Sequence, residues 1–240
     1  MKSGLAISTF MRKEGINRRL DIFKRCINTF IESEFDGKLF IVDDGSEIDD
    51  HLQYAEGRGD PRIRIHKKPE NRGVAAAKNT GIRLCLEDGC DVMFLSDDDM
   101  VFEHTRWFAP YEEAVEKTGI GHFSYAVDNA AGLSSRTVEV KGYKVRRTDM
   151  VNGCFLVVTA DMIKQVGYFK ILPYKYGHEH SNFSIRCKQK IGEFYDVLGS
   201  NSLVHLNIDS LANCSIKVDQ AGFKKNEEVM YDMKKMACIE

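Results

Sequence analysis

Short apolar runs alternate with amphipathic segments through residues 1–126, and this alternation constrains the fold more than any other feature. The apolar runs predict strands at 5–10, 38–42, 62–66, 91–96 and 120–126. The segments between them predict helices at 20–32, 48–55, 74–87 and 107–117. This pattern is typical of an α/β fold in which helices connect the strands of a mostly parallel sheet. Such a sheet binds its ligands along the edge where the strands end.

The alternation stops after Val127, where the patterns become shorter. Strands are predicted at 133–145, 153–158, 194–197 and 202–206, and helices at 180–190 and 219–236. The sequence contains no internal repeat and no Pro- or Gly-rich linker. We therefore expect a single domain over 1–240, in which 127–218 complete the globule begun by 1–126 and 219–240 form a C-terminal helix.

The composition narrows the class of protein. A net charge of −2 gives no overall field that would recruit nucleic acid or an acidic membrane. No apolar run approaches the roughly 20 residues of a membrane-spanning helix, and the first residues lack a signal-peptide pattern. The seven cysteines are scattered and include no CxxC pair. We therefore expect reduced thiols in a cytoplasmic protein, without a disulfide framework or a zinc site.

Three consecutive aspartates, Asp97, Asp98 and Asp99, directly follow the predicted strand 91–96. Adjacent carboxylates repel one another, and this repulsion costs stability unless a positive charge joins them. Hard oxygen ligands suit Mg²⁺ or Mn²⁺. The triplet therefore predicts a metal or nucleotide site at the end of a buried strand, with an ordinary acidic surface turn as the alternative.

Two further motifs follow strand ends. A carboxylate of Asp43 or Asp44, ahead of Gly45, can accept from a base or a ribose hydroxyl, or can form an Asx turn that caps the next helix. The third helix is expected to begin with Asn71 as its N-cap. Its early basic residues, Arg72 and Lys78, lie near the helix N-terminus, where the helix dipole favours phosphate. They also fit a solvated helix surface.

Histidines mark the second half of the chain. His178 and His180 flank Glu179 and suggest acid/base or ligand chemistry. Their spacing does not put both histidines on one helix face, so they need not share a metal. His205 lies inside a short apolar run, where a hydrogen-bonded core histidine is the better interpretation from the residues alone.

The order of these motifs resembles that of the GT-A glycosyltransferases, specifically the family 2-like group. The resemblance covers roughly residues 4–208 and rests on Ser8-Thr9-Phe10, Asp43-Asp44-Gly45-Ser46 (DDGS), the stretch 71–82 (NxGxxxARNxGI), Asp97–Asp99 (DxD), Val166-Gly167-Tyr168-Phe169 (VGGFD), Gly177-His178-Glu179-His180 (GxED) and His205.

The resemblance implies a GT-A, Rossmann-like fold, a nucleotide-diphosphate sugar donor that is most often a UDP-sugar, and a Mn²⁺ or Mg²⁺ ion. Residues 1–126 would bind the donor and 127–218 the acceptor. The donor contacts would come from Ser8, Asp43, Asp44, Arg72, Lys78, Asp97 and Asp98. The metal ligands would be Asp97, Asp99 and His205, with Asp99 the best single ligand and the register within the triplet open by one residue.

The chain departs from this family at the catalytic base. The family has an aspartate after the glutamate of its ED pair, and here His180 occupies that position. Either residue can deprotonate an acceptor hydroxyl. We favour Glu179, because a carboxylate also stabilises the positive charge that develops at the sugar; His180 would then position the acceptor. Direct displacement at the anomeric carbon would invert its configuration.

The acceptor follows only from the resemblance, which makes a saccharide or glycan the default. A phage-type transfer to a hydroxymethylated DNA base is an alternative, with two basic clusters as candidate phosphate contacts. These clusters are Arg62, Arg64, Lys67 and Lys68, and Lys141, Lys144, Arg146 and Arg147. A non-catalytic nucleotide-sugar-binding protein is a second alternative. A nucleotidyltransferase is a third, although residues 8–12 lack the Gly-rich phosphate loop it would need.

Overall fold

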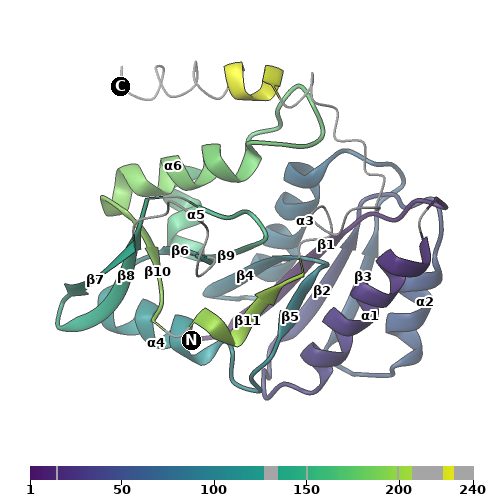
Figure 1. Ribbon diagram of the computed structural model, residues 1–240, viewed down its shortest axis with the longest axis horizontal. Coiled ribbons are helices and arrows are strands. Elements are labelled where there is room, and N and C mark those ends of the chain that lie inside the picture. The colour runs from purple at the N-terminus through teal and green to yellow at the C-terminus, as the bar shows by residue number, and fades with distance from the viewer. Residues whose placement is uncertain (15, 127–134, 150, 199, 207–223, 230–240) are drawn as a thin grey trace.

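A six-stranded sheet forms the centre of the computed structural model, which describes residues 1–14, 16–126, 135–149, 151–198, 200–206 and 224–229 (Figure 1). The strand order is β3-β2-β1-β4-β9-β6. The strands are β1 (Ser3–Thr9), β2 (Lys38–Asp43), β3 (Ile63–Lys67), β4 (Val92–Asp97), β6 (His122–Ser124) and β9 (Phe155–Thr159). The expected α/β class with a mostly parallel central sheet is confirmed.

One strand of this sheet runs against the others. The first four strands along the chain pair in parallel. Strand β9 then pairs antiparallel with both β4 and β6, so it lies between them. The apolar pattern of 153–158 predicts this strand but not its place, because a strand buried on both faces has the same pattern in either direction.

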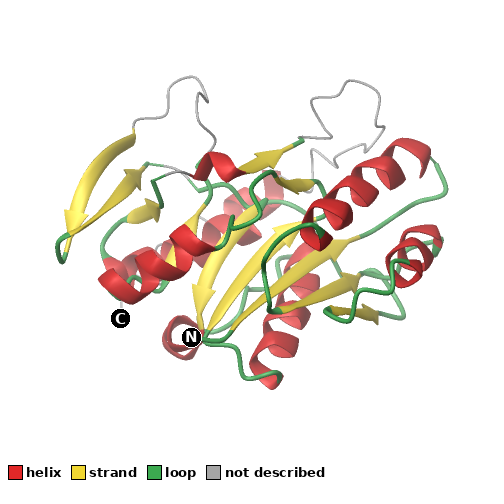
Figure 2. Cartoon of the chain, turned by 90° about the horizontal axis from the view of Figure 1, so that it is seen from below, coloured by secondary structure: helices red, strands yellow, loops and turns green. Residues whose placement is uncertain are grey.

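Helices cover both faces of the sheet (Figures 1 and 2). One face carries α1 (Ile16–Ile31), α2 (Asp50–Gly57) and α4 (Ala109–Thr118), which share a core with inward residues of β1, β2 and β4. The other face carries α3 (Val74–Glu87), α5 (Ala160–Val166) and α6 (Glu179–Ile191), which share a second core. Among the described residues, no helix is long and apolar enough to cross a membrane.

Helix α3 approaches the sheet closely, as its small residues predict. A Cβ added at Gly81 would lie 2.6 Å from the Cβ of Ala6 in β1, so only glycine fits there. This contact fixes α3 across β1, with its N-terminus at the edge where the strands end. The strand register brings the ends of β1, β2 and β4 to this same edge, because Ser8 of β1 pairs with Val42 of β2 on one side and with Asp97 of β4 on the other.

Two smaller sheets complete the described structure. Strand β5 (Met100–Phe102) pairs antiparallel with β11 (Leu203–His205), which follows a 3-10 turn at Ser200–Ser202. The other sheet contains β7 (Ser135–Val140), β8 (Tyr143–Thr148) and β10 (Phe194–Asp196). The single strand predicted at 133–145 is, in its described part, a hairpin that turns at Lys141 and Gly142 with φ of 49° and 81°.

The predicted C-terminal helix is described in part. Residues 224–229 are helical, and the rest of 219–236 lies outside the described residues. The described cysteines that the structure buries are free thiols: Cys26, Cys85, Cys90, Cys154 and Cys187.

Candidate active site

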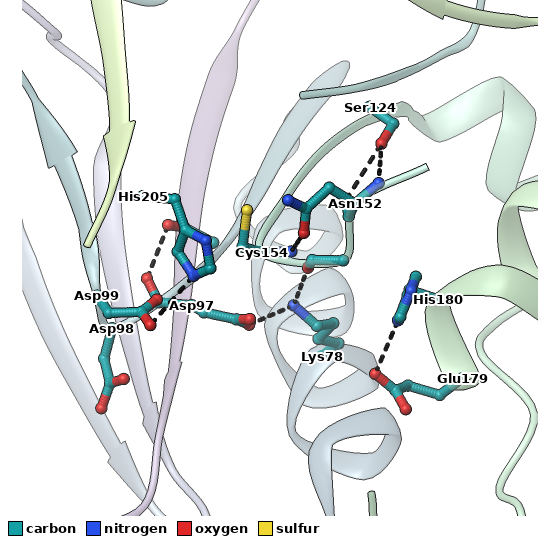
Figure 3. Close-up of polar contacts among 12 residues, drawn as sticks. Lys78, Asp97, Asp98, Asp99, Ser124, Asn152, Cys154, Glu179, His180 and His205 are labelled. Carbon is teal, nitrogen blue, oxygen red and sulfur yellow. Dashed lines mark hydrogen bonds and ion pairs between the residues drawn. The ribbon is translucent and has the colours of Figure 1, made fainter. Parts of the chain in front are cut away.

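The acidic triplet forms the turn between β4 and β5, and its three side chains point in different directions (Figure 3). Asp97 faces α3, where its Oδ1 accepts from Lys78 Nζ at 2.7 Å. Asp99 faces β11, and its Oδ2 lies 3.2 Å from His205 Nε2. The turn therefore brings the ends of two sheets together, and the pairing of β5 with β11 carries His205 to the triplet.

The middle aspartate is directed to the opposite side of the turn. Asp98 accepts from Thr9 Oγ1 at 2.6 Å and from Arg19 Nη2 at 2.9 Å. Its side chain is buried, so these two partners hold the turn rather than face a ligand. The donor contact predicted for Asp98 stays a prediction.

The charges of the triplet are only partly balanced. Burial, opposed in part by Lys78 and reinforced by Asp99, raises the pKa of Asp97 to about 6. Burial likewise raises the pKa of Asp98 in spite of Arg19. The Oδ1 atom of Asp99 is buried and has no hydrogen-bond partner in the structure. A buried carboxylate oxygen without a partner is costly, and a cation would satisfy it.

These residues fit a divalent cation that takes its remaining ligands from water and substrate. Asp97, Asp99 and His205 offer two hard oxygens and one imidazole, which suit Mn²⁺ or Mg²⁺. Among the described residues, no group of three or more His, Cys, Asp or Glu side chains is arranged to hold a metal by itself. An ion that keeps waters and binds substrate phosphates does not need such a complete set.

Lys78 lies inside the protein, with only 1% of its surface exposed. Its Nζ donates to Asp97 and, at 3.1 Å, to the carbonyl oxygen of Gly153. Although burial lowers it, the pKa of Lys78 is raised overall by Asp97, so the ammonium stays charged. The residue connects the acidic turn to the loop before β9, and its predicted donor contact stays a prediction.

Both aspartates of the DDGS turn hold loops. Asp43 is fully buried; its Oδ2 accepts from the Ser46 N–H at 3.0 Å, and its Oδ1 lies 3.1 Å from His51 Nε2. Burial raises the pKa of Asp43, but the hydrogen bonds from His51 and Ser46 outweigh it and lower the pKa. The side chain thus holds the turn at Ser46 and does not cap the next helix, which begins at Asp50. Its predicted contact with a base stays a prediction.

Asp44 caps the start of α3 from outside the helix. Its Oδ2 accepts from the N–H groups of Arg72 at 3.1 Å and Gly73 at 2.6 Å, and Lys68 pairs with Oδ1. The N-cap position belongs to Gly73, with φ of 91°, so the expectation of Asn71 as N-cap is wrong. A carboxylate from another strand end supplies the capping oxygen instead.

The surface beside this turn is hollowed. A depression of about 370 Å³ is lined by Gly45, Ser46, Lys67, Lys68 and Pro69. The side chain of Arg72 is exposed and pairs with Glu70 at 2.8 Å. Ser8 is half-buried at the end of β1, between the DDGS strand and the acidic strand. The donor contacts predicted for Ser8 and Arg72 stay predictions.

The predicted catalytic pair opens α6. His178 takes the N-cap position with φ of 65°, a left-handed conformation that a non-glycine residue seldom adopts. Glu179 follows, buried, with Oε2 accepting from the Gly177 N–H at 3.0 Å and Oε1 lying 3.3 Å from His180 Nδ1. Burial raises the pKa of Glu179, but His180 outweighs this effect and lowers it. Glu179 is therefore a carboxylate at neutral pH.

Gly153 lies between Lys78, the partner of the acidic turn, and His180 of the catalytic pair. Its carbonyl accepts from Lys78, while a Cβ added to it would lie 2.6 Å from Cγ and Nδ1 of His180. Sequence reasoning placed Gly153 only at the start of a predicted strand and Thr9 only in the Ser8-Thr9-Phe10 motif. It did not pair Thr9 or Arg19 with Asp98, because Asp98 lies 89 and 79 residues away from them.

Several members of the basic clusters considered as nucleic-acid contacts are paired within the protein. In the first cluster, Lys67 pairs with Asp49 and Lys68 with Asp44. Arg62 donates to the carbonyls of Ile31, Ser33 and Phe35 and pairs with Asp60, so it closes the C-terminal end of α1. In the second cluster, Arg147 pairs with Glu193 at 2.6 Å.

Comparisons with known proteins agree with this geometry. The sequence model described as "Glycosyl transferase family 2" matches residues 15–188. The chain is 32% identical over 250 residues to an uncharacterized glycosyltransferase, R363, of Acanthamoeba polyphaga mimivirus, with all of this chain and 96% of that protein aligned.

Similar solved structures share the fold at low identity. One is the mannosyltransferase PcManGT of Pyrobaculum calidifontis in complex with GDP-Man and Mn²⁺, with a TM-score of 0.58, 13% identity, and coverage of 79% of this chain and 52% of that one. GalNAc-T7 with UDP, GalNAc and Mn²⁺ has a TM-score of 0.62, 12% identity, and coverage of 82% and 42%. TarS of S. aureus (1–349) in complex with UDP has a TM-score of 0.57, 12% identity, and coverage of 78% and 55%.

The chain thus spans about half the length of these solved structures. The family match covers most of the chain, and the mimivirus protein aligns along nearly its whole length. The chain therefore belongs to glycosyl transferase family 2 and is a transferase that moves a sugar from a nucleotide-sugar donor.

Proposed function

We propose that this enzyme is a metal-dependent, inverting glycosyltransferase that uses a nucleotide-diphosphate sugar, specifically a UDP-sugar, and a saccharide acceptor. The observation that carries the proposal is the buried Oδ1 of Asp99, which has no hydrogen-bond partner. The other oxygen of Asp99 lies 3.2 Å from His205 Nε2 in β11, and Asp97 is two residues away. Structures with the same fold were solved with Mn²⁺ and a nucleotide or nucleotide sugar. A cytoplasmic location fits the free, buried thiols.

The assignment gives Asp97, Asp99 and His205 to Mn²⁺ or Mg²⁺. When bound, the cation would neutralise the negative charge that develops on the leaving diphosphate. Lys78 keeps the Asp97 carboxylate turned toward α3, and Asp98 anchors the turn to Arg19 and Thr9. The DDGS turn and the depression beside it would receive the nucleoside.

We assign the transfer step to Glu179 and His180 at the start of α6. Glu179 is ionised, and its Oε1 lies 3.3 Å from Nδ1 of His180. We assign the proton of the imidazole to Nδ1, so that it donates to this carboxylate. Nε2 of His180 then holds a free electron pair and takes the proton of the acceptor hydroxyl, while Glu179 stabilises the imidazolium. The acceptor oxygen bonds to the anomeric carbon, the bond from that carbon to the diphosphate breaks, and its electron pair leaves with the diphosphate.

This assignment refines the choice made from the sequence. Glu179 alone was favoured there, but its two oxygens are occupied by Gly177 and His180 in the structure, whereas 26% of the His180 side chain is exposed. We therefore propose that His180 takes the proton and that Glu179 is its partner. The ion pairs of Lys67, Lys68 and Arg147 within the protein favour a saccharide over DNA as acceptor.

A panel of nucleotide sugars with Mn²⁺, scored by thermal shift, identifies the donor, because a ligand that binds only the folded state raises Tm. Asp99→Asn should abolish the Mn²⁺-dependent part of the shift. Asp161→Asn is the matched control, since Asp161 is 82% exposed on α5, and should retain it. If Asp99→Asn keeps the full Mn²⁺ dependence, the metal assignment is wrong.

The catalytic pair is tested by release of nucleoside diphosphate with a saccharide acceptor present. Both Glu179→Gln and His180→Asn should lower kcat by about 10²- to 10⁴-fold, the usual contribution of general acid–base catalysis. Full activity in both variants would remove the pair from the mechanism. Release of pyrophosphate instead of nucleoside diphosphate would indicate a nucleotidyltransferase.

A further inference from the structure

Asn226 lies in the helical turn 224–229, far along the chain from the motifs of the active site, yet its side chain is fully buried. This turn, yellow in Figure 1, lies next to the loop that leads into α6. Sequence reasoning gave the region only as part of a charged amphipathic helix. The burial of one polar side chain there requires partners, because an unsatisfied buried amide is costly.

The amide of Asn226 binds the backbone of this loop at four places. Its Oδ1 accepts from the Tyr174 N–H at 3.1 Å. Its Nδ2 lies 3.1, 3.0 and 3.1 Å from the carbonyl oxygens of Tyr174, Tyr176 and Gly177. Every partner is a backbone atom, so the side chain holds the path of the loop rather than a particular side chain.

The opposite side of the same loop contacts the site. The N–H of Gly177 donates to Glu179 Oε2 at 3.0 Å. The carbonyl of Lys175 accepts from the N–H of Val74, the first residue of α3, at 3.1 Å. The loop is thus fixed between the start of α3 and the start of α6, and Asn226 binds the carbonyls on both sides of the N–H that holds Glu179.

We propose that Asn226 is a positioning residue for the Glu179–His180 pair, acting through the Gly177 peptide; this inference rests on the proposed function. Without the amide, the carbonyls of residues 174, 176 and 177 lose their partner. The Gly177 peptide can then rotate, and its N–H no longer fixes Glu179. Within the described part of the chain, the hydrogen bonds of Asn226 go to this loop and not to the acidic turn, so donor binding is spared.

The decisive variant is Asn226→Asp, which keeps the shape and Oδ1 but replaces the donating NH₂ by an oxygen facing three carbonyls. Asn226→Ala removes all four contacts. The matched control is Lys224→Ala, an exposed side chain on the same turn. All variants are made in the full chain and compared for kcat, donor KM, and the Tm shift caused by nucleoside diphosphate with Mn²⁺.

We expect both Asn226 variants to lower kcat by about 10- to 100-fold, the effect of misplacing a reacting group by about 1 Å. Donor KM and the ligand-induced Tm shift should stay within about twofold of wild type, and Lys224→Ala should behave as wild type. An unchanged kcat in Asn226→Asp overturns the proposal. So does a loss of donor binding in parallel with kcat, since this would indicate a general structural role.

Amide hydrogen exchange supplies a readout that needs no activity. In Asn226→Asp the Gly177 amide should exchange faster, while amides of β1 and β4 keep their protection. Unchanged protection at Gly177 refutes the link to Glu179 even if no donor is turned over. Conversely, if the Gly177 amide responds as expected but the wild-type protein transfers from no nucleotide sugar, the proposed function is refuted and the contact of Asn226 with the loop is not.

Discussion

The ion pair of Lys78 with Asp97 offers the most direct test of how the acidic turn is held. We consider Lys78→Met, which removes the charge and keeps an unbranched side chain of similar length. Lys78 is 1% exposed and loses two partners, the Asp97 carboxylate at 2.7 Å and the Gly153 carbonyl at 3.1 Å. Asp97 would then face Asp99 without a counter-charge.

The magnitude follows from burial. Removing one partner of a fully buried ion pair costs about 3–5 kcal/mol. The Asp97 side chain is 36% exposed, so water screens part of this cost. We therefore expect the free energy of unfolding to fall by about 2–3 kcal/mol at neutral pH, including about 1 kcal/mol for the hydrogen bond to Gly153. For a chain of this size that corresponds to a decrease in Tm of about 4–12 °C.

The assay is urea unfolding of Lys78→Met, Asp97→Asn and the double variant in a double-mutant cycle. The double variant should recover about half of the loss or more, because no uncompensated charge is left. Lys164→Met is the control, since Lys164 pairs with Asp161 on the surface and should change stability by less than about 0.5 kcal/mol. A loss below about 0.5 kcal/mol for Lys78→Met, or a double variant no more stable than it, would refute this account of the turn.

Two other predictions concern buried contacts. Burial lowers the pKa of His122 to about 4, so protons bind the unfolded chain first. The free energy of unfolding should therefore fall as the pH drops from about 6.5 to 4, by about 3 kcal/mol at pH 4. His122→Asn removes the titrating ring that contacts Val157 and Ser184 and should reduce this pH dependence in unfolding titrations; an unchanged slope would contradict the assignment. Gly153→Ala should displace the His180 ring and lower the free energy of unfolding by about 1–3 kcal/mol. Adding His180→Ala should recover part of this loss in thermal unfolding. If the effects of the two substitutions simply add, the His180 ring is not what the alanine side chain meets.

The fold could be predicted from the sequence where local pattern decides structure. The strand–helix alternation through 1–126 reflects burial of each strand on both faces and of each helix on one, and these elements lie where expected. Strand β5 was missed because three residues after an acidic triplet carry too short a pattern. The place of β9 was missed because strand order depends on long-range pairing, which the apolar pattern of a single strand does not contain.

For the candidate site, the sequence indicated the residue types but not their directions. Asp97, Asp98 and Asp99 are equivalent as letters, and only the turn shows that the middle one points toward Arg19. Arg62 reads as a surface cation, yet it closes α1 by binding carbonyls 27 to 31 residues earlier in the chain. Such roles depend on partners distant in sequence, so no local pattern reports them.

The antiparallel insertion of β9 also has a consequence for how the chain assembles. As the protein is synthesised, β1 to β4 can pair as soon as residues 1–97 are available, whereas β6 has no direct neighbour among them. Until β9 emerges, the outer edge of β4 offers unpaired backbone groups, which are prone to pair with another chain. Completion of the sheet, delivery of the Asn152–Cys154 loop and placement of Gly153 beside Lys78 therefore occur in one late event. The contact between Lys78 and Gly153 thus forms when β9 covers the outer edge of β4, whereas α6 and β11, which carry Glu179, His180 and His205, follow later in the chain.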